Sequence, residues 1–362
     1  MCWIPRRKKE IHIYLFAYRT FRWDSEANIK AHVHCVIIGF SCDTDGSDKK
    51  SKYIFTGDNV VSATNINPYL FDAPNVFIES RGKPICNVPP LTKGNQATDD
   101  GNFILTPDQR DELIQKYPQI APHIRRYIGA VDFLNNNQVR YCLWLKDVSP
   151  SVYAKIPEVM QRLQNIRDFR SKSTAEPTRK AADWPYRFFS TPQTNTNYLI
   201  IPRASSERRY YLPIGFMEGN NIASDSCSII LNASLYHFGI LTSNVHMSWM
   251  RAVCGRLKSD YRYSGAIVYN NFPWPDVTEK MKDEIAAAAQ EILDARALFP
   301  DCSLAELYDE ATMQPELRKA HQVNDKAVMK AYGFSLSMTE PEIVAELMKL
   351  YQQLVDAEQK SK

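Results

Sequence analysis

The chain has 362 residues, which is enough to bury a hydrophobic core and to form two or three folded units. Its apolar, aromatic and charged fractions are those of a soluble globular protein. No apolar run reaches the roughly 18 residues of a membrane helix, so no membrane span is expected. The eight cysteines are scattered without Cys-x-x-Cys pairs, which favours reduced thiols and a cytoplasmic location.

The net charge of +3 hides an asymmetry along the chain. Residues 276–362 contain 10 Lys and Arg against 17 Asp and Glu, a formal charge of −7, so residues 1–275 carry +10. A basic body is compatible with a polyanionic partner such as nucleic acid. A basic face that is simply solvated would show the same count, so charge alone leaves both interpretations open.

The start of the chain predicts a small β-sheet. Two apolar-aromatic runs, residues 11–18 and 31–40, are expected as buried strands. A polar turn over residues 41–52 then leads to a returning strand at residues 53–55.

Two short patterns in this sheet region have metal-ligand residues, and neither supports a metal site. The polar turn has Asp43 where a calcium loop would begin, but its twelfth position, which needs a bidentate glutamate, is Ile54. His32 and His34 share a strand face from which Cys35 points away, and no second ligand pair has suitable spacing. No metal is therefore expected.

The middle of the chain predicts loops, one capped helix and several short strands. Residues 66–93 are rich in Pro and Asn and are expected as a surface loop. Thr106 is expected to cap a helix that runs to about Tyr117, and residues 122–127 are expected as a short helical turn. Further strands are expected over four short segments: residues 139–145, 198–202, 210–216 and 227–231.

Residues 156–170 have the spacing of an amphipathic helix, with Val159, Met160, Leu163 and Ile166 directed inward. Its opposite face and the segment that follows are basic: Arg162, Arg167, Arg170, Lys172, Arg179 and Lys180. These residues form either a solvated face or a track for a phosphate backbone.

A second helix is predicted around residue 250, followed by an extended segment. Trp249, Met250, Val253 and Leu257 fall on one helical face. Residues 258–263 then alternate charged and aromatic side chains, which is the pattern of a strand that presents one row of side chains outward. The remaining chain predicts a helical region with helix starts at Thr278, Ser303, Pro315 and Thr339.

The sequence offers no set of catalytic residues. None of the 13 glycines stands two positions from another, so no Gly-x-Gly cofactor loop is present. Amino-methylating enzymes place an Asn-Pro-Pro-aromatic turn at the target base. Residues 87–91 depart from that turn because Val88 is inserted and Leu91 replaces the aromatic residue.

Two pairs of oppositely charged residues have the chemistry of a base-pair reader. Arg and Lys donate to guanine O6 and N7, whereas Asp and Glu accept from cytosine N4. Lys258 and Asp260 stand two positions apart on the alternating segment, and Arg203 and Asp225 each border a predicted strand. Ordinary surface ion pairs have the same composition, so that alternative stays open.

Long motifs in a fixed order extend over almost the whole chain. They are residues 16–21, 31–40, 72–76, 141–145, 205–209, 235–264, 270–275 and 316–321. In these motifs the chain resembles the MmeI-like family, single-chain type II restriction–modification enzymes that methylate adenine.

The resemblance implies an α+β fold in three parts. Residues 1–60 would be the end of the methyltransferase domain and a remnant of its sheet, residues 61–275 a β-rich mixed target-recognition domain, and residues 276–362 a C-terminal helical domain. Complete family members also have a nuclease and a domain that binds S-adenosylmethionine. The chain is therefore expected to be a truncated gene product or a fragment, without a cofactor or catalytic residues of its own.

The resemblance also implies sequence-specific recognition of double-stranded DNA. Lys258 with Asp260, and Arg203 with Asp225, would each imply a guanine, and Arg262 falls at a further specificity position. Contacts to the DNA backbone are expected from five arginines: Arg162, Arg167, Arg170, Arg208 and Arg209.

Two other interpretations remain. The chain could complete a separately encoded methyltransferase half and so take part in adenine methylation with S-adenosylmethionine. Alternatively, it could be a remnant that binds no DNA.

Overall fold

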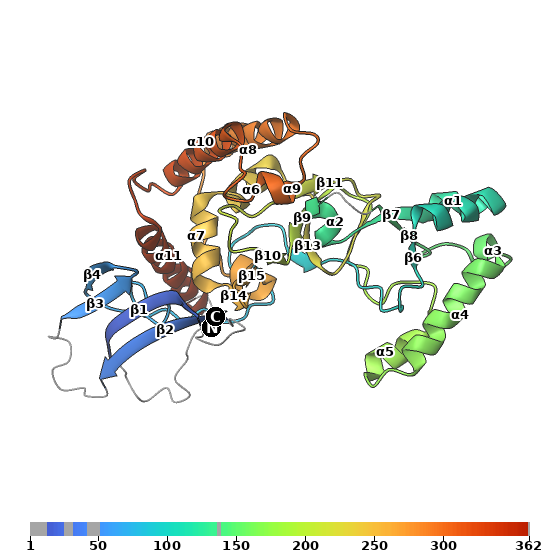
Figure 1. Cartoon of the computed structure of the whole chain (residues 1–362), viewed down its shortest axis with the longest axis horizontal. Coiled ribbons are helices and arrows are strands. Elements are labelled where there is room, and N and C mark those ends of the chain that lie inside the picture. Colours follow the sequence, from blue (N-terminus) through green and yellow to red (C-terminus); the bar gives the residue numbers. More distant parts are fainter. Residues whose placement is uncertain (1–12, 25–31, 42–50, 136–138, 361–362) are drawn as a thin grey trace.

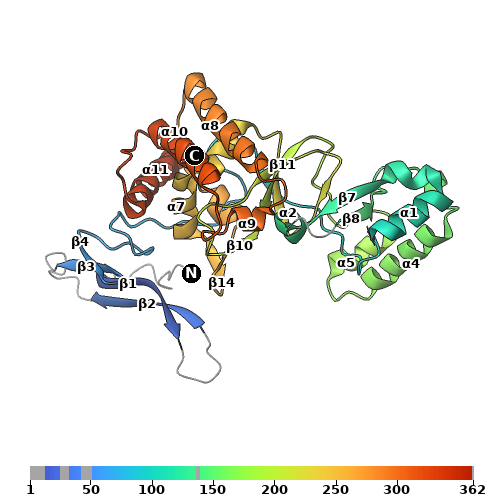
Figure 2. The same ribbon diagram turned by 45° about the horizontal axis from the view of Figure 1, so that its top comes forward.

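The computed structural model describes residues 13–24, 32–41, 51–135 and 139–360, which form a mixed α and β structure with four small sheets (Figure 1). A four-stranded sheet from the start of the chain lies at one end and a lobe containing helix α4 (Pro157–Ser171) at the other. A central body carries the C-terminal helices (Figures 1 and 2). The predicted α+β class is confirmed.

The N-terminal sheet has the order β2-β1-β3-β4, with β1 parallel to β3 and antiparallel to β2. Its strands are β1 (Ile13–Asp24), β2 (His32–Ser41), β3 (Lys52–Thr56) and β4 (Asn59–Ala63). Ala17 and Ile54 pack on Ile66 and Leu70 from the following loop. Within the described residues the three predicted strands are present. The prediction that the first two are buried is wrong for one face of the sheet, where Phe16 and Ile37 are 39% and 47% exposed. Most of the predicted polar turn lies outside the described residues.

The central body contains two further sheets. One has the order β11-β9-β13-β5, formed by β5 (Leu91–Lys93), β9 (Tyr198–Pro202), β11 (Gly215–Met217) and β13 (Cys227–Leu231). The other has the order β10-β15-β14, formed by β10 (Ala204–Ser205), β14 (Gly255–Leu257) and β15 (Asp260–Arg262). Every residue of β9 is buried, so the first of these sheets lies in the core.

The lobe opposite the N-terminal sheet has its own core, in which Phe103, Phe188, Leu163 and Ile166 are buried. Its sheet has the order β12-β7-β8-β6, formed by β6 (Ile104–Leu105), β7 (Ile124–Ile128), β8 (Arg140–Leu143) and β12 (Ile222–Ala223). Its helices are α1 (Pro107–Lys116), α3 (Pro150–Tyr153), α4 (Pro157–Ser171) and α5 (Glu176–Lys180). We call this part the α4 lobe.

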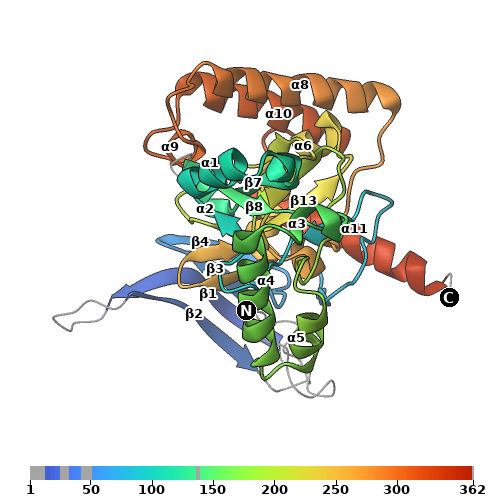
Figure 3. The same cartoon turned by 90° about the vertical axis from the view of Figure 1, so that its right-hand side faces the viewer.

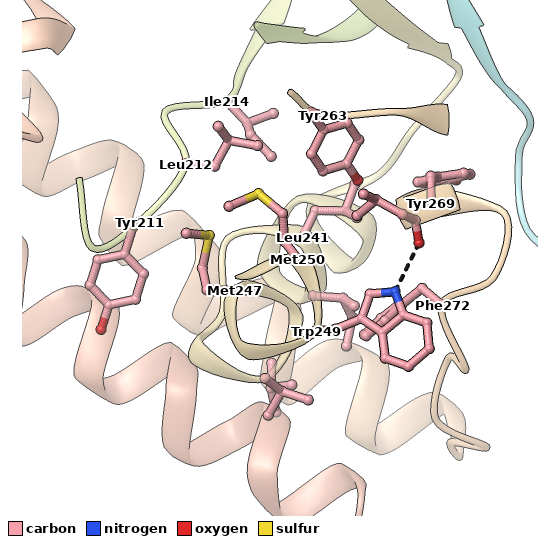
Figure 4. Packing of buried hydrophobic residues seen from close by; sticks show 14 of the residues in the cluster. Tyr211, Leu212, Ile214, Leu241, Met247, Trp249, Met250, Tyr263, Tyr269 and Phe272 are labelled. Atoms are coloured by element: carbon pink, nitrogen blue, oxygen red, sulfur yellow. Dashed lines mark hydrogen bonds between the residues drawn. The ribbon is translucent and has the colours of Figure 1, made fainter. Parts of the chain in front are cut away.

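The central body is built around helix α7 (Asn244–Val253), where Trp249 is fully buried and donates from Nε1 to the carbonyl oxygen of Val268 over 3.0 Å (Figure 4). Met250 and Phe272 belong to the same cluster. The helices of the body are α2 (Ala130–Asn135), α6 (Leu235–Leu241), α7 (Asn244–Val253), α8 (Glu279–Ala297), α9 (Leu304–Leu307), α10 (Pro315–Ala331) and α11 (Glu340–Lys360). Helices α8 and α10 lie side by side along one side of the molecule (Figure 3).

Several local predictions are wrong. Helix α7 ends at Val253 because Cys254 has an extended backbone (φ −69°, ψ 138°), so Leu257 lies in β14 with 55% of its side chain exposed. Residues 124–128 form strand β7 rather than a helical turn, and residues 210–214 precede strand β11. Met160 is 42% exposed, although the other three predicted inward residues of α4 are buried.

No helix within the described ranges is long and apolar enough to cross a membrane. The same residues contain no group of three His, Cys, Asp or Glu side chains that could hold a metal ion.

Candidate nucleic-acid interface

The predicted reader pair Lys258 and Asp260 lies at the end of a β-hairpin. Strands β14 and β15 pair antiparallel, and Leu257 faces Asp260, so Lys258 and Ser259 form the turn. Lys258 has φ +56°, in the left-handed region that non-glycine residues seldom adopt. The prediction that Lys258 lies on an extended strand is therefore wrong. Both charged side chains are exposed where the hairpin turns.

Alternation along β15 separates an inward row from an outward row. Tyr261 and Tyr263 are buried, whereas Asp260 and Arg262 are exposed. The hydroxyl of Tyr263 lies 3.1 Å from Nε2 of the buried His246 on α7. The predicted period-two pattern is confirmed for these residues, and its physical cause is the burial of the two tyrosines.

An arginine holds the turn of the hairpin. The guanidinium of Arg256 lies 4.3 Å from the ring centroid of Tyr261, and its Nη1 donates to the carbonyl oxygen of Ser259 over 3.1 Å. A cation over an aromatic face is attracted by the ring quadrupole. Arg256 therefore fixes the turn that carries Lys258, a role that the sequence pattern did not indicate.

The structure brings Arg203 and Asp225 together. Arg203 follows β9 and Asp225 precedes β13, and these strands are neighbours in one sheet. Nη1 of Arg203 donates to the main-chain carbonyl oxygen of Asp225 over 3.1 Å. The carboxylate of Asp225 instead forms an ion pair with Lys93 over 3.0 Å. Sequence reasoning missed Lys93 because β5 lies far from β13 in the chain.

Arg208 and Arg209 follow β10 in the loop beside the hairpin. Arg208 is exposed and forms a 3.0 Å ion pair with Asp309. Burial lowers the pKa of Arg209, while the carboxylates of Asp309 and Asp260 act in the opposite direction. The loop therefore places both arginines near the C-terminal region, and it places Arg209 within the electrostatic reach of Asp260.

The three arginines predicted on α4 have different environments. Arg167 is exposed. Arg162 is half-buried, and its Nη1 donates to the carbonyl oxygens of Asn102 and Ile104 over 3.0 and 3.3 Å. Its burial lowers the pKa of the guanidinium. Nη1 of Arg162 is thus directed at its own lobe.

Arg170 is fully buried, so the prediction that it contacts a DNA phosphate is wrong. Burial lowers its pKa to about 10. The guanidinium donates to the carbonyl oxygens of five residues: Ala97, Thr98, Ala181, Trp184 and Arg187. All of its polar hydrogens point into the protein, and Arg170 joins separate segments of the α4 lobe.

Helices α8 and α10 lie away from the β14–β15 hairpin, α5 and the N-terminal sheet (Figures 1 and 3). Acidic residues from elsewhere in the C-terminal region do lie beside the hairpin: Asp309, Glu310 and Glu340 line a pocket together with Tyr261 of β15. The charge asymmetry along the chain therefore does not correspond to separate basic and acidic sides of the molecule.

Three family models match successive parts of the chain. Residues 1–56 match the MmeI DNA-methyltransferase domain, residues 72–276 the MmeI target recognition domain, and residues 277–357 the MmeI C-terminal domain.

Two relatives agree with these matches. DNA methyltransferase A of Bacillus subtilis (strain 168) is 39% identical over 342 residues, which cover 94% of this chain and 38% of that protein. A solved structure of the type IIL restriction–modification enzyme MmeI in complex with DNA is similar at a TM-score of 0.85 and 42% identity. That match covers 95% of this chain and 46% of the enzyme. The chain thus spans less than half the length of either relative. It belongs to the MmeI family, as the resemblance predicted, and it carries that family's target recognition domain.

Proposed function

We propose that this chain recognises a specific sequence in double-stranded DNA through the surface formed by the β14–β15 hairpin, Arg203 and Asp225. The observation that carries the proposal is that backbone hydrogen bonds connect the segment after Arg203 to the hairpin that carries Lys258 and Asp260. Ala204 pairs with Arg262 and Ser205 with Tyr261, so the segment after Arg203 is hydrogen-bonded to the hairpin. We also propose a cytoplasmic location, which the scattered cysteines without Cys-x-x-Cys pairs favour.

In this proposal the base edges are read by donors and acceptors of opposite charge. Lys258 and Arg203 would each donate to a guanine, and Asp260 and Asp225 would each accept from the paired cytosine. Arg262 is the outward neighbour of Asp260 on β15 and would contact a further base. The exposed Arg167, Arg208 and the half-buried Arg209 would contact phosphates, which fix position and carry no sequence information. Arg170 is excluded from this set by its burial.

The division into parts is also a proposal. Residues 61–275 would form the recognition domain, residues 276–362 its helical support, and residues 1–60 the end of a methyltransferase domain. The ion pair between Arg208 and Asp309 supports the role of the helical region, because it holds a recognition-side loop from the C-terminal side.

Selection from a pool of random duplex DNA tests the proposal directly. The purified chain is expected to enrich one sequence that contains at least two G·C pairs, with an affinity that falls steeply as salt rises. Recovery of an unenriched pool would contradict sequence recognition. Absence of salt-dependent binding would instead favour a remnant that binds no DNA.

A second function is supported by the bare face of the N-terminal sheet. Phe16, Tyr18, Tyr53 and Ile37 are 36 to 47% exposed, and the ring of Tyr18 stacks on Phe55 at 4.2 Å. This face would be covered by the remainder of a methyltransferase domain on a separate chain; the match of residues 1–56 to the MmeI DNA-methyltransferase domain supports this proposal.

In that assembly S-adenosylmethionine would bind the partner chain, since the glycines of this chain form no Gly-x-Gly loop. Co-expression with a protein that carries the cofactor loop and the Asn-Pro-Pro-aromatic turn tests the assembly. Joint purification and DNA methylation are expected, and failure to co-purify would contradict it.

A further inference from the structure

Asp225 has a basic neighbour that is distant in sequence. Lys93 is the last residue of β5, which pairs antiparallel with β13, and Lys93 faces Ser228 in that pairing. This register places the lysine beside the start of β13, where Asp225 precedes the strand. Nζ of Lys93 lies 3.0 Å from Oδ2 of Asp225 and 3.5 Å from Oε1 of Gln96.

The two cations near Asp225 bind different parts of it. Arg203 donates to the main-chain carbonyl oxygen, whereas Lys93 binds the carboxylate. A guanidinium has five N–H donors, so Arg203 keeps several for a group outside the protein. A carboxylate has two oxygens, and Lys93 binds one of them. Oδ1 is thus left to accept a hydrogen bond from DNA.

The Lys93–Asp225 ion pair is poorly suited to a role in stability. The side chains of Lys93 and Asp225 are 44% and 40% exposed, and ion pairs in contact with solvent contribute little to folding. Its effect is geometric, because a lysine bound to one carboxylate oxygen restricts the rotation of the aspartate side chain.

We propose that Lys93 is a positioning residue of the recognition surface. By binding Oδ2 it holds Asp225 so that Oδ1 accepts the N4 amino hydrogen of a cytosine, while Arg203 donates to the paired guanine. This inference rests on the proposed function and adds to it the residue that sets the preference of the Arg203–Asp225 pair.

The test compares Lys93→Gln and Lys93→Arg with the natural chain. The base pair read by Asp225 is first identified as the one at which Asp225→Asn loses discrimination. Dissociation constants are then measured for the selected duplex and for duplexes altered at each position in turn. Lys93→Gln is expected to reduce discrimination about tenfold at that base pair alone, a loss typical of one good base contact. Lys93→Arg is expected to restore most of it.

Lys282→Gln is the matched control. Lys282 is 39% exposed and forms a 2.7 Å ion pair with Glu279 on α8, so the substitution removes the same charge from a similar ion pair. This substitution is expected to leave the discrimination at every base pair unchanged. Thermal unfolding of all variants checks that each remains folded.

Other outcomes overturn the inference. An equal loss of affinity for every duplex, with a salt dependence shallower by about one phosphate contact, would make Lys93 a phosphate ligand. If Lys93→Gln leaves the discrimination at every base pair unchanged, the Lys93–Asp225 ion pair has no role in recognition. If the natural chain shows no sequence preference, the proposed function itself is refuted. This result would be known from the first selection, before any Lys93 variant is measured.

Discussion

The backbone amide of Tyr263 donates a hydrogen bond of 3.0 Å to the carbonyl oxygen of Arg203. Arg203 is also bonded through its own amide to the carbonyl oxygen of Ser226, the residue after Asp225. One set of main-chain hydrogen bonds therefore joins the hairpin that carries Asp260 to the two strands that position Arg203 and Asp225. Side chains on such a frame keep a fixed spacing, which sequence-specific contact with a regular duplex requires.

The hairpin predicts a switch of specificity. Replacing Lys258 by Glu and Asp260 by Arg reverses the donor and the acceptor at the hairpin end, so one preferred G·C pair is expected to become C·G. The change is worth about 1–3 kcal/mol of discrimination at that position. Repeating the random-duplex selection with the double variant measures it. The base pair assigned to Arg203 serves as the internal control, and an unchanged site would refute the assignment of Lys258 and Asp260.

Arg167 and Arg170 predict opposite phenotypes although both lie on α4. Arg170→Ala leaves five carbonyl oxygens of the α4 lobe without their donor and is expected to cost roughly 3–5 kcal/mol of unfolding free energy, measured by urea denaturation. Arg167→Ala removes an exposed charge, so stability should be preserved while the salt dependence of DNA binding becomes shallower by about one contact. Equal stability of the two variants would contradict the structural role of Arg170.

The buried His246 predicts a loss of stability in acid. Burial lowers the pKa of His246 to about 3 in the folded chain, against about 6.5 when unfolded. Below pH 6.5 the unfolded state binds a proton that the folded state does not, so this contribution to stability is complete above pH 6.5 and falls as the pH drops towards 3. At pH 4.5 the loss is on the order of 2–3 kcal/mol.

Urea denaturation at several pH values, with the natural chain and His246→Gln, checks this expectation. The variant should lose less stability between pH 6.5 and 4.5, because one proton-linked group has been removed. It should also be less stable at pH 7, because the hydrogen bond between His246 and Tyr263 is altered. Identical pH profiles would show that His246 does not titrate between the two states.

Patterns within one element could be predicted from the sequence. The side chain of Thr106 accepts from the N–H of Gln109, and Ser303 and Glu306 form a capping box, so helices α1 and α9 begin where predicted. The alternation of Tyr261 and Tyr263 likewise set the inward face of β15.

The errors have a common physical cause, which is contact between distant segments. The buried guanidinium of Arg170 binds carbonyl groups from two separate segments, residues 97–98 and 181–187, and its charge alone does not predict that these segments enclose it. Lys93 meets Asp225 only because β5 adds to the edge of β13. Leu257 continued the helical spacing of α7, but periodicity cannot detect that the backbone becomes extended at Cys254. A single sequence shows which residues are present but does not show which distant residues contact each other.

The exposed aromatic face of the N-terminal sheet allows a substitution that should prevent binding of a methyltransferase partner without affecting DNA recognition. Tyr53 is 42% exposed on β3 and faces Phe16 on the parallel neighbour β1, so Tyr53→Lys places a charge within the aromatic face. Coverage of this face by a methyltransferase partner would bury that charge without a counterion, which costs several kcal/mol. Co-purification with the partner is therefore expected to be lost, whereas DNA binding by the chain alone should be unchanged, because Tyr53 lies on a different sheet from the hairpin. Leu298→Lys, at a position that is 63% exposed just after α8, is the control and should leave both properties intact. Normal co-purification of the Tyr53 variant would show that the partner does not cover this face.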